Sequence, residues 1–160
     1  MKLTVKGKVF SLKDNYEVID EYGSVRFRVV SESAFRFRVH IYDAFDQEIG
    51  YVEDTSKITR TSYDLYDESG LFAHMYRGKG FFISKYHLEE LGWTIKSANV
   101  WGYKYDYYCG TELVGHMETE GLKSVYHLDV THDDDAPVCM LVTLAILHEI
   151  AKAAAAAAAA

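Results

Sequence analysis

Apolar and polar residues alternate along most of the chain before residue 131. Alternation with a period of two is the pattern of a strand that buries one of its faces. The alternating segments are short and run into turn residues, most clearly at 16–23, 39–43 and 63–70. At typical strand and loop lengths, the pattern predicts about ten to twelve strands joined as consecutive hairpins.

An aspartate recurs at the ends of these segments as a weak internal repeat. Asp20, Asp43 and Asp67 are spaced by 23 and 24 residues, and Glu90 before Gly92 continues the series after a further 23. Asp accepts hydrogen bonds from the backbone of a turn, and Gly adopts positive φ, so each copy predicts a strand end and a tight turn. Serial hairpins in this number indicate a barrel or a sandwich.

The alternation stops at an acidic turn, residues 131–135. Between Val138 and Leu147 only Thr143 is polar, which predicts a helix at about 136–151 without a polar face. A helix that is apolar all round must be buried on every side or lie in lipid, and this run is shorter than the about 20 residues that span a bilayer. A closed barrel can surround such a helix completely. We therefore expect a mainly β fold: a closed antiparallel barrel of about twelve strands around a central apolar C-terminal helix.

The acidic turn is also expected to start this helix. The side chain of Asp134 or Asp135 is predicted to cap the helix N-terminus, where negative charge suits the helix dipole. Pro137 is compatible with the first helical turn.

Length and composition fit a single domain over residues 1–152. The chain has 160 residues, of which 49% are apolar and 14% aromatic, enough for a sizeable core. Residues 153–160 are eight alanines, interpreted as a stand-in for unidentified side chains or as an added tail. If they belong to the chain, they lengthen the apolar segment and favour a membrane anchor, although Glu149 and Lys152 interrupt it.

Charge and cysteine usage narrow the function classes. The formal net charge of −7 argues against a nucleic-acid partner, because phosphate backbones require a basic face. Residues 1–10 lack the long apolar stretch of a signal peptide. Cys109 and Cys139 are expected to be reduced thiols of a cytoplasmic protein, with Cys139 in the core.

Two parts of the chain resemble a known family. The segments 5–12 and 16–20 resemble the first hairpin, and 135–147 the central helix, of the LURP-one-related and YxjI-like branch of the tubby C-terminal-like superfamily. The resemblance covers most of residues 1–152. It implies a twelve-stranded barrel around a central helix, related to phospholipid scramblases and to tubby, which binds phosphoinositides. It brings no catalytic residues, and the lipid-binding motif of tubby is not recognisable here.

The candidate binding site is a set of basic residues on two neighbouring predicted strands. In 25–30 and 35–41, apolar and basic side chains alternate, and the short connection between the segments predicts that they pair. The basic face should point outward and carry Arg26, Arg28, Arg36, Arg38 and His40. Because Arg binds phosphate in a bidentate manner, we expect phospholipid head-group binding there. The alternative is that carboxylates on neighbouring strands, such as Glu17, Glu48 and Glu53, pair with these residues.

No metal site, cofactor site or catalytic centre is predicted. His127 and His132 lie near an acidic run, but their spacing matches neither a zinc protease nor an EF-hand loop. Cys109 and His116 would need contact and an orienting third group to act as a nucleophile and base. Residues 78–80 are too short for a phosphate-cradling loop.

Three functions are compatible with these patterns. The first is a non-enzymatic domain that binds anionic phospholipid, located in the cytoplasm and peripheral at the membrane, without a transmembrane span. The second is a soluble scaffold that binds a protein partner and no lipid, for which the aromatic run 101–108 is suggestive. The third is a barrel with a small ligand in its lumen, which the apolar helix argues against because the helix should fill that space.

Overall fold

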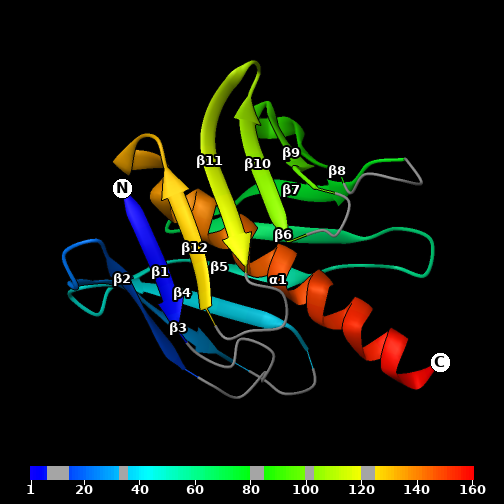
Figure 1. Ribbon diagram of the computed structural model, residues 1–160, viewed down its shortest axis with the longest axis horizontal. Helices are drawn as coiled ribbons and strands as arrows, with labels where there is room; N and C mark the ends of the chain where they lie inside the picture. Colours follow the sequence, from blue (N-terminus) through cyan, green and yellow to red (C-terminus); the bar gives the residue numbers. More distant parts are fainter. Residues whose placement is uncertain (7–14, 33–35, 80–84, 100–102, 120–124) are drawn as a thin grey trace.

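The computed structural model describes residues 1–6, 15–32, 36–79, 85–99, 103–119 and 125–160. Within these residues, twelve strands form one sheet that closes into a barrel (Figure 1). The strands are β1 (Lys2–Lys6), β2 (Tyr16–Asp20), β3 (Val25–Ser31), β4 (Arg38–Asp43), β5 (Glu48–Asp54), β6 (Ser62–Asp67), β7 (Gly70–Arg77), β8 (Lys85–Leu88), β9 (Trp93–Ser97), β10 (Lys104–Cys109), β11 (Glu112–Thr119) and β12 (Val125–Val130).

Every strand pairs antiparallel with its neighbours in sequence, so the sheet is an up-and-down meander. The barrel closes where β1 pairs with β12, with Leu3 opposite Leu128 and Val5 opposite Tyr126. These four side chains are buried. The predicted fold class, a closed antiparallel barrel of twelve strands with one C-terminal helix, is confirmed.

The aspartate repeat forms tight turns, as predicted. One Oδ1 of each aspartate accepts backbone N–H bonds of 2.8–2.9 Å from the turn that follows: Asp20 from Tyr22 and Ser24, Asp43 from Phe45 and Gln47, and Asp67 from Ser69. In each hairpin the register shifts shortly before the turn, at Val18/Ile19, Ile41/Tyr42 and Leu65/Tyr66. Such bulges increase strand twist, which helps the sheet to curve. The copy at Glu90 differs: it forms a 3-10 turn, η1 (Glu89–Leu91).

Because successive strands run in opposite directions, their connections alternate between the two ends of the barrel. The turn end carries the connections 20–24, 43–48, 67–70, 89–92 and 109–112, together with 131–135 before the helix. The loop end carries the other connections, of which 55–61 is described throughout.

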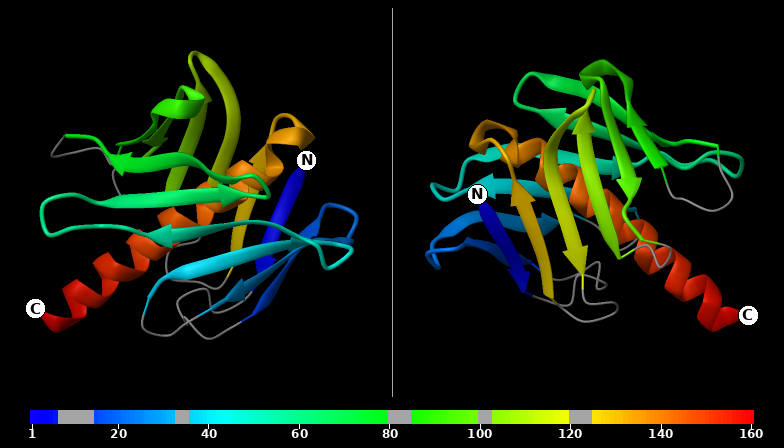
Figure 2. Two further views of the ribbon diagram at one scale, coloured as in Figure 1. Left: turned by 180° about the vertical axis from the view of Figure 1, so that it is seen from behind. Right: turned by 45° about the horizontal axis from the view of Figure 1, so that its top comes forward.

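The helix α1 (Ala136–Ala159) enters the barrel at the turn end and leaves it at the loop end. Figure 2 shows it running diagonally through the barrel, with its last turns outside. The predicted start at residue 136 agrees with the structure, whereas the helix continues beyond 151 through the alanines.

The expected side-chain cap of the helix is absent. Asp133–Asp135 form a 3-10 turn, η2, and Asp135 precedes the helix without a side-chain capping bond. The physical reason lies in the backbone of Asp135, whose φ of −84° and ψ of −7° already follow a helical path. A capping side chain requires an extended backbone at that position.

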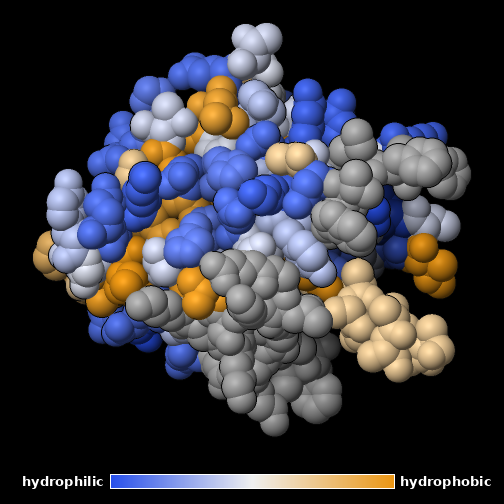
Figure 3. Space-filling view, viewed as in Figure 1, coloured by the Kyte–Doolittle hydropathy of each residue, from blue (hydrophilic) through white to orange (hydrophobic). Residues whose placement is uncertain are grey.

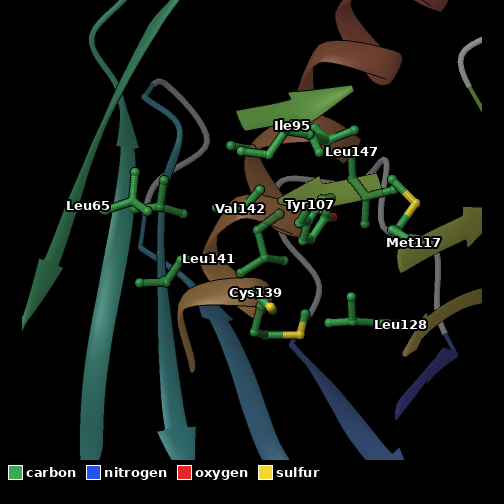
Figure 4. Close-up of a cluster of buried hydrophobic side chains, with 14 of the residues drawn as sticks. Leu65, Ile95, Tyr107, Met117, Leu128, Cys139, Leu141, Val142 and Leu147 are labelled. Atoms are coloured by element: carbon green, nitrogen blue, oxygen red, sulfur yellow. The ribbon is translucent and has the colours of Figure 1, made fainter. Parts of the chain in front are cut away.

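The helix fills the interior of the barrel. Ala136 and the run from Cys139 to Leu147 are buried. In Figure 4 the side chains of Cys139, Leu141, Val142 and Leu147 lie among those of the surrounding strands. Two wall glycines permit this close approach. A Cβ at Gly50 would lie 3.3 Å from Cδ1 of Leu141, and one at Gly115 would lie 3.0 Å from Sγ of Cys139. The interior is therefore occupied by protein, and binding surfaces are to be sought outside.

The segment Asp133–Ala159 contains a stretch that is long and apolar enough, by length and composition, to cross a membrane. Half of that stretch is buried inside the barrel. The alanines supply the length that the run from Val138 to Leu147 lacks by itself. Figure 3 shows them in pale orange, projecting from the rest of the molecule.

Candidate functional site

The five predicted binding residues lie on the outer face of one strand pair but do not form one cluster. Phe27, Val29, Val39 and Ile41 point into the core, so the alternating basic side chains point outward. Arg28 lies opposite Tyr42 in the β3–β4 register. Tyr42 is four residues from Arg38 along β4, so Arg28 and Arg38 are separated by roughly 13 Å along the strands. Because the strands are antiparallel, Arg26 and Arg28 lie near the turn end, and Arg36 and Arg38 near the loop end.

Arg38 and His40 belong to a network of ion pairs. Nε and Nη2 of Arg38 donate to Oε2 of Glu53 at 3.0 and 2.7 Å, and its Nη1 lies 3.6 Å from Glu32. His40 Nε2 lies 2.7 Å from Glu32, and its Nδ1 contacts Glu48. These bonds raise the pKa of Arg38 and lower that of Glu32. A phosphate at Arg38 would have to displace Glu53, which is itself buried.

The other three arginines are more exposed. Arg28 donates to Asp46 at 2.7 Å and lies over the ring of Tyr42. Arg36 reaches Glu53 only at 4.0 Å, and 62% of its side chain is exposed. Arg26 has no side-chain partner among the described residues. Pairing with Glu48 and Glu53, the alternative considered from the sequence, is present in the structure, and Asp46 is a further partner.

The structure reveals a second basic surface, here called the cationic groove. It has a volume of about 620 Å³ and is lined by Lys57, Ile58, Thr59, Arg60, Thr61, Tyr76, Arg77, Gly78 and Lys79. Four of these nine residues are Lys or Arg, and none of the described lining residues is Asp or Glu. On a chain with a net charge of −7, this is a marked local excess of positive charge.

Two neighbouring connections build the groove. Backbone bonds of 2.8 and 3.1 Å between Lys57 and Arg60 close a tight turn, and Ile58 at its tip is fully exposed, with a relative exposure of 107%. Arg60 stacks over the ring of Tyr76, 4.6 Å from its centroid. The other wall comes from the end of β7, where the Gly78 amide donates to the backbone carbonyl oxygen of Lys85 at 2.7 Å.

Further lysines extend the positive charge beside the groove. Lys85 and Lys96 lie directly opposite each other on β8 and β9. Burial and then the nearby Lys85 lower the pKa of His87, whose ring would lie about 3.0 Å from a Cβ at Gly78. Burial, and after it the charge of Lys85, therefore disfavours an additional proton on this imidazole.

Sequence reasoning missed this groove because its two walls are about twenty residues apart. Each connection alone shows only two cations, Lys57 with Arg60 and Arg77 with Lys79. The signal was nevertheless present. In an up-and-down meander alternate connections share an end, and this places 55–61 beside the connection after β7.

Charge is strongly polarised along the barrel axis. The six segments of the turn end contain thirteen Asp and Glu residues and no Lys or Arg. The described parts of the loop-end connections contain one acidic residue, Glu32, and four basic residues: Arg36, Lys57, Arg60 and Lys79. The helix dipole, with its positive N-terminus at the turn end, complements the acidic residues there.

A polar cluster lies where the helix leaves the barrel. Ligand atoms of Asp54, His148 and Glu149 lie within 4.8 Å of one another, a set that could hold a metal ion. However, Nζ of Lys152 lies 2.6 Å from Glu149 and 3.1 Å from Asp54, so a cation already bridges both carboxylates. Burial lowers the pKa of Lys152, but these hydrogen bonds raise it on balance. The cluster joins helix and wall as an ion-pair network.

The histidines and cysteines considered from the sequence have other contacts. His132 lies 3.0 Å from Glu112, and His127 lies 3.3 Å from the Thr4 hydroxyl. His116 Nδ1 lies 2.6 Å from Asp106. Sγ of Cys109 points at the carbonyl of Leu91 at 3.8 Å, so no Cys–His pair forms among the described residues.

Comparison with known proteins places the chain in a family. The model of the LURP-one-related family matches residues 1–147. The X-ray structure of a protein from Arabidopsis thaliana is similar, with a TM-score of 0.62 and 14% identity over 93% of this chain and 90% of that chain. At that identity the likeness concerns the fold alone. No curated protein matches the sequence. The chain belongs to the LURP-one-related family.

Proposed function

We propose that this chain is a non-enzymatic module that binds anionic phospholipid head groups at a membrane surface through the cationic groove. The observation that carries the proposal is the grouping of Lys57, Arg60, Arg77 and Lys79 around one concavity with no described carboxylate in its lining. Lys and Arg near an anionic leaflet each contribute about 1 kcal/mol of attraction. The groove can thus supply several kcal/mol of attraction to an anionic membrane, whereas the acidic remainder of the surface is repelled by it.

Ile58 gives the groove an apolar anchor. Its side chain is fully exposed at the tip of a tight turn, between Lys57 and Arg60 of the groove wall. An exposed aliphatic side chain surrounded by cations suits the boundary between head groups and acyl chains. Burial of an isoleucine side chain contributes about 1.5–3 kcal/mol.

The polarity of the barrel favours one orientation on the membrane. An anionic surface attracts the loop end and repels the turn end with its thirteen carboxylates. In that orientation the projecting end of α1 also lies on the membrane side, because the helix leaves the barrel at the loop end. The proposed location is the cytoplasmic surface of a membrane, where anionic lipids are concentrated.

The strand-face residues Arg26, Arg28, Arg36, Arg38 and His40 form the alternative lipid site. Arg38 and His40 would have to leave the carboxylates that bind them. Arg26 and Arg36, which are more exposed, lie near opposite ends of the strand pair. These contacts make the strand face the weaker candidate.

Two matched triple variants distinguish these sites. The groove variant loses three positive charges through Lys57→Gln, Arg60→Gln and Lys79→Gln. The strand variant loses three from the strand face through Arg26→Gln, Arg28→Gln and Arg36→Gln. Sedimentation with phosphatidylcholine vesicles, with and without phosphatidylserine, measures binding at low and high salt. We expect the groove variant to lose about a hundredfold in affinity for anionic vesicles, at about 1 kcal/mol per cation, and the strand variant far less.

The reverse pattern would move the site to the strand face. If the unmodified protein does not bind anionic vesicles at low salt, membrane binding is refuted and the protein-scaffold function replaces it. Ile58→Ser changes no charge, so it should weaken binding while leaving the salt dependence intact.

A further inference from the structure

A second groove lies at the opposite end of the barrel, where the helix enters. It has a volume of about 590 Å³, and its apolar lining consists of Ile49, Phe72, Leu91, Pro137, Val138 and Leu141. The rim is formed by the β6–β7 turn, through Asp67, Glu68 and Ser69. We refer to it as the acidic groove.

Most of the large apolar side chains described as exposed also lie at the turn end. Of the large apolar residues described as exposed, Tyr22, Val25, Phe45, Leu71 and Leu113 lie in or beside turn-end connections, whereas Ile58 alone lies at the loop end. Phe45 and Tyr22 are 91% and 86% exposed. Figure 3 shows apolar patches among polar side chains on the side of the molecule where the N-terminus lies. Apolar surface of this kind, rimmed by charge, is typical of protein interaction sites.

The charge around the acidic groove is mostly not neutralised by cations. Asp67 accepts bonds from Ser69, Glu68 from the Gln47 amide, and Glu90 from the His74 backbone. These donors satisfy the carboxylates as hydrogen-bond acceptors, but a backbone or amide donor leaves the negative charge in place. Among the described turn-end carboxylates, two have a Lys, Arg or N-terminal amine as ion-pair partner. Asp46 pairs with Arg28, and Asp133 lies 3.8 Å from the Met1 amine.

We infer that the acidic groove docks a cationic amphipathic peptide segment of a protein partner. Large apolar side chains on one side of the segment fill the groove, and Lys or Arg on the other side pairs with the rim, as when an amphipathic helix lies in an apolar groove. Charge complementarity selects this occupant. A second copy of the turn end would bring thirteen more carboxylates, and an anionic lipid surface would be repelled in the same way.

The inference adds a second site, independent of the proposed lipid site at the other end. With the loop end on a membrane, the acidic groove faces the aqueous side. A protein with both sites would hold a cationic partner segment close to an anionic membrane. The acidic groove would keep the cations of that segment from binding the membrane itself.

A labelled synthetic peptide of Leu and Lys, patterned as an amphipathic helix, is the probe. Fluorescence anisotropy should show binding that weakens with salt, and a scrambled peptide of the same composition should bind at least about tenfold more weakly. Ser69→Arg places a bulky cation on the rim. Ser24→Arg is the matched control, because both serines are exposed in turn-end connections and the change in charge is the same.

We expect Ser69→Arg to lower peptide affinity by about tenfold or more, and Ser24→Arg by at most about threefold. Both variants should keep the thermal transition of the unmodified protein and its binding to anionic vesicles, which concerns the other end. The inference is overturned if the unmodified protein does not bind the patterned peptide, if the scrambled peptide binds as well, or if the two variants lose affinity equally.

Discussion

The hydroxyl of Tyr107 in β10 lies 2.7 Å from Oγ1 of Thr143 in α1, and both residues are fully buried. Thr143 donates its own proton to the carbonyl of Cys139 at 2.7 Å, so Tyr107 is the donor of the first bond. Burial raises the pKa of Tyr107 well above its usual value, which keeps this proton in place. The polar side chain within the apolar run of the helix is thus satisfied twice.

Removing either partner should destabilise the barrel unequally. Tyr107→Phe removes a donor, while Thr143 keeps its bond to Cys139, so we expect a cost of about 1 kcal/mol. Thr143→Val leaves the tyrosine hydroxyl buried without a partner, which costs about 1–3 kcal/mol. The double variant should lose less than the sum of the two, as measured by denaturant unfolding in a double-mutant cycle. Strict additivity would show that the two side chains do not interact.

A charge in the middle of the helix should be far more damaging. Val142 is fully buried among the strands, so Val142→Asp buries a carboxylate without a partner and should unfold the domain, at a cost above about 4 kcal/mol. Ala155→Asp is the control, since Ala155 is exposed on the projecting part of the same helix. Circular dichroism should show a cooperative transition for Ala155→Asp and none for Val142→Asp. A folded Val142→Asp protein would place the helix outside the barrel.

Protonation of His148 should loosen the helix exit. Its ring stacks on Phe37 at a centroid distance of 3.9 Å, and its Nδ1 lies 2.9 Å from the hydroxyl of Tyr63. That hydroxyl donates its proton to Glu149 at 2.5 Å, so Nδ1–H of a neutral imidazole is the donor to Tyr63. Burial lowers the pKa of His148 below its usual value of 6.5.

A lowered pKa means that the unfolded chain takes up the proton first as the pH falls. The stability contributed by neutral His148 is therefore complete above about pH 6.5 and declines as the pH falls from there to the pKa of the folded state. We expect the unfolding free energy of the unmodified protein to fall more steeply below pH 6.5 than that of His148→Phe, which keeps the aromatic stack. His132, whose bond to Glu112 raises its pKa, acts with the opposite sign. Parallel pH profiles for the two proteins would contradict the role of His148.

The fold was largely predictable from the sequence because its signals are local. Period-two alternation, the Asp turns at 20, 43 and 67, and the apolar run after Val138 each depend on neighbouring residues. The helix cap was not predictable in this way. Whether Asp135 caps the helix depends on its backbone angles, and the 3-10 turn before the helix sets these.

The candidate sites were less predictable because they depend on which end of the barrel a residue occupies. Alternation correctly placed Arg28 and Arg38 on the outer face, but strand direction carries them to opposite ends. The carboxylates of Glu53 and Asp46 that pair with them come from outside the strand pair. The cationic groove likewise combines two connections, and only the order of strands in the sheet shows that Arg60 and Lys79 are neighbours.

The position of α1 after the last strand has a consequence for synthesis. As the chain leaves the ribosome, each hairpin can pair with the one before it, but the seam between β1 and β12 and the filling of the interior wait for residues 125–147. Until then the inner faces of the nascent strands expose their apolar side chains to water, a state prone to aggregation. Folding of this barrel is therefore completed late. The apolar surface that a chaperone could cover is largest just before the helix emerges.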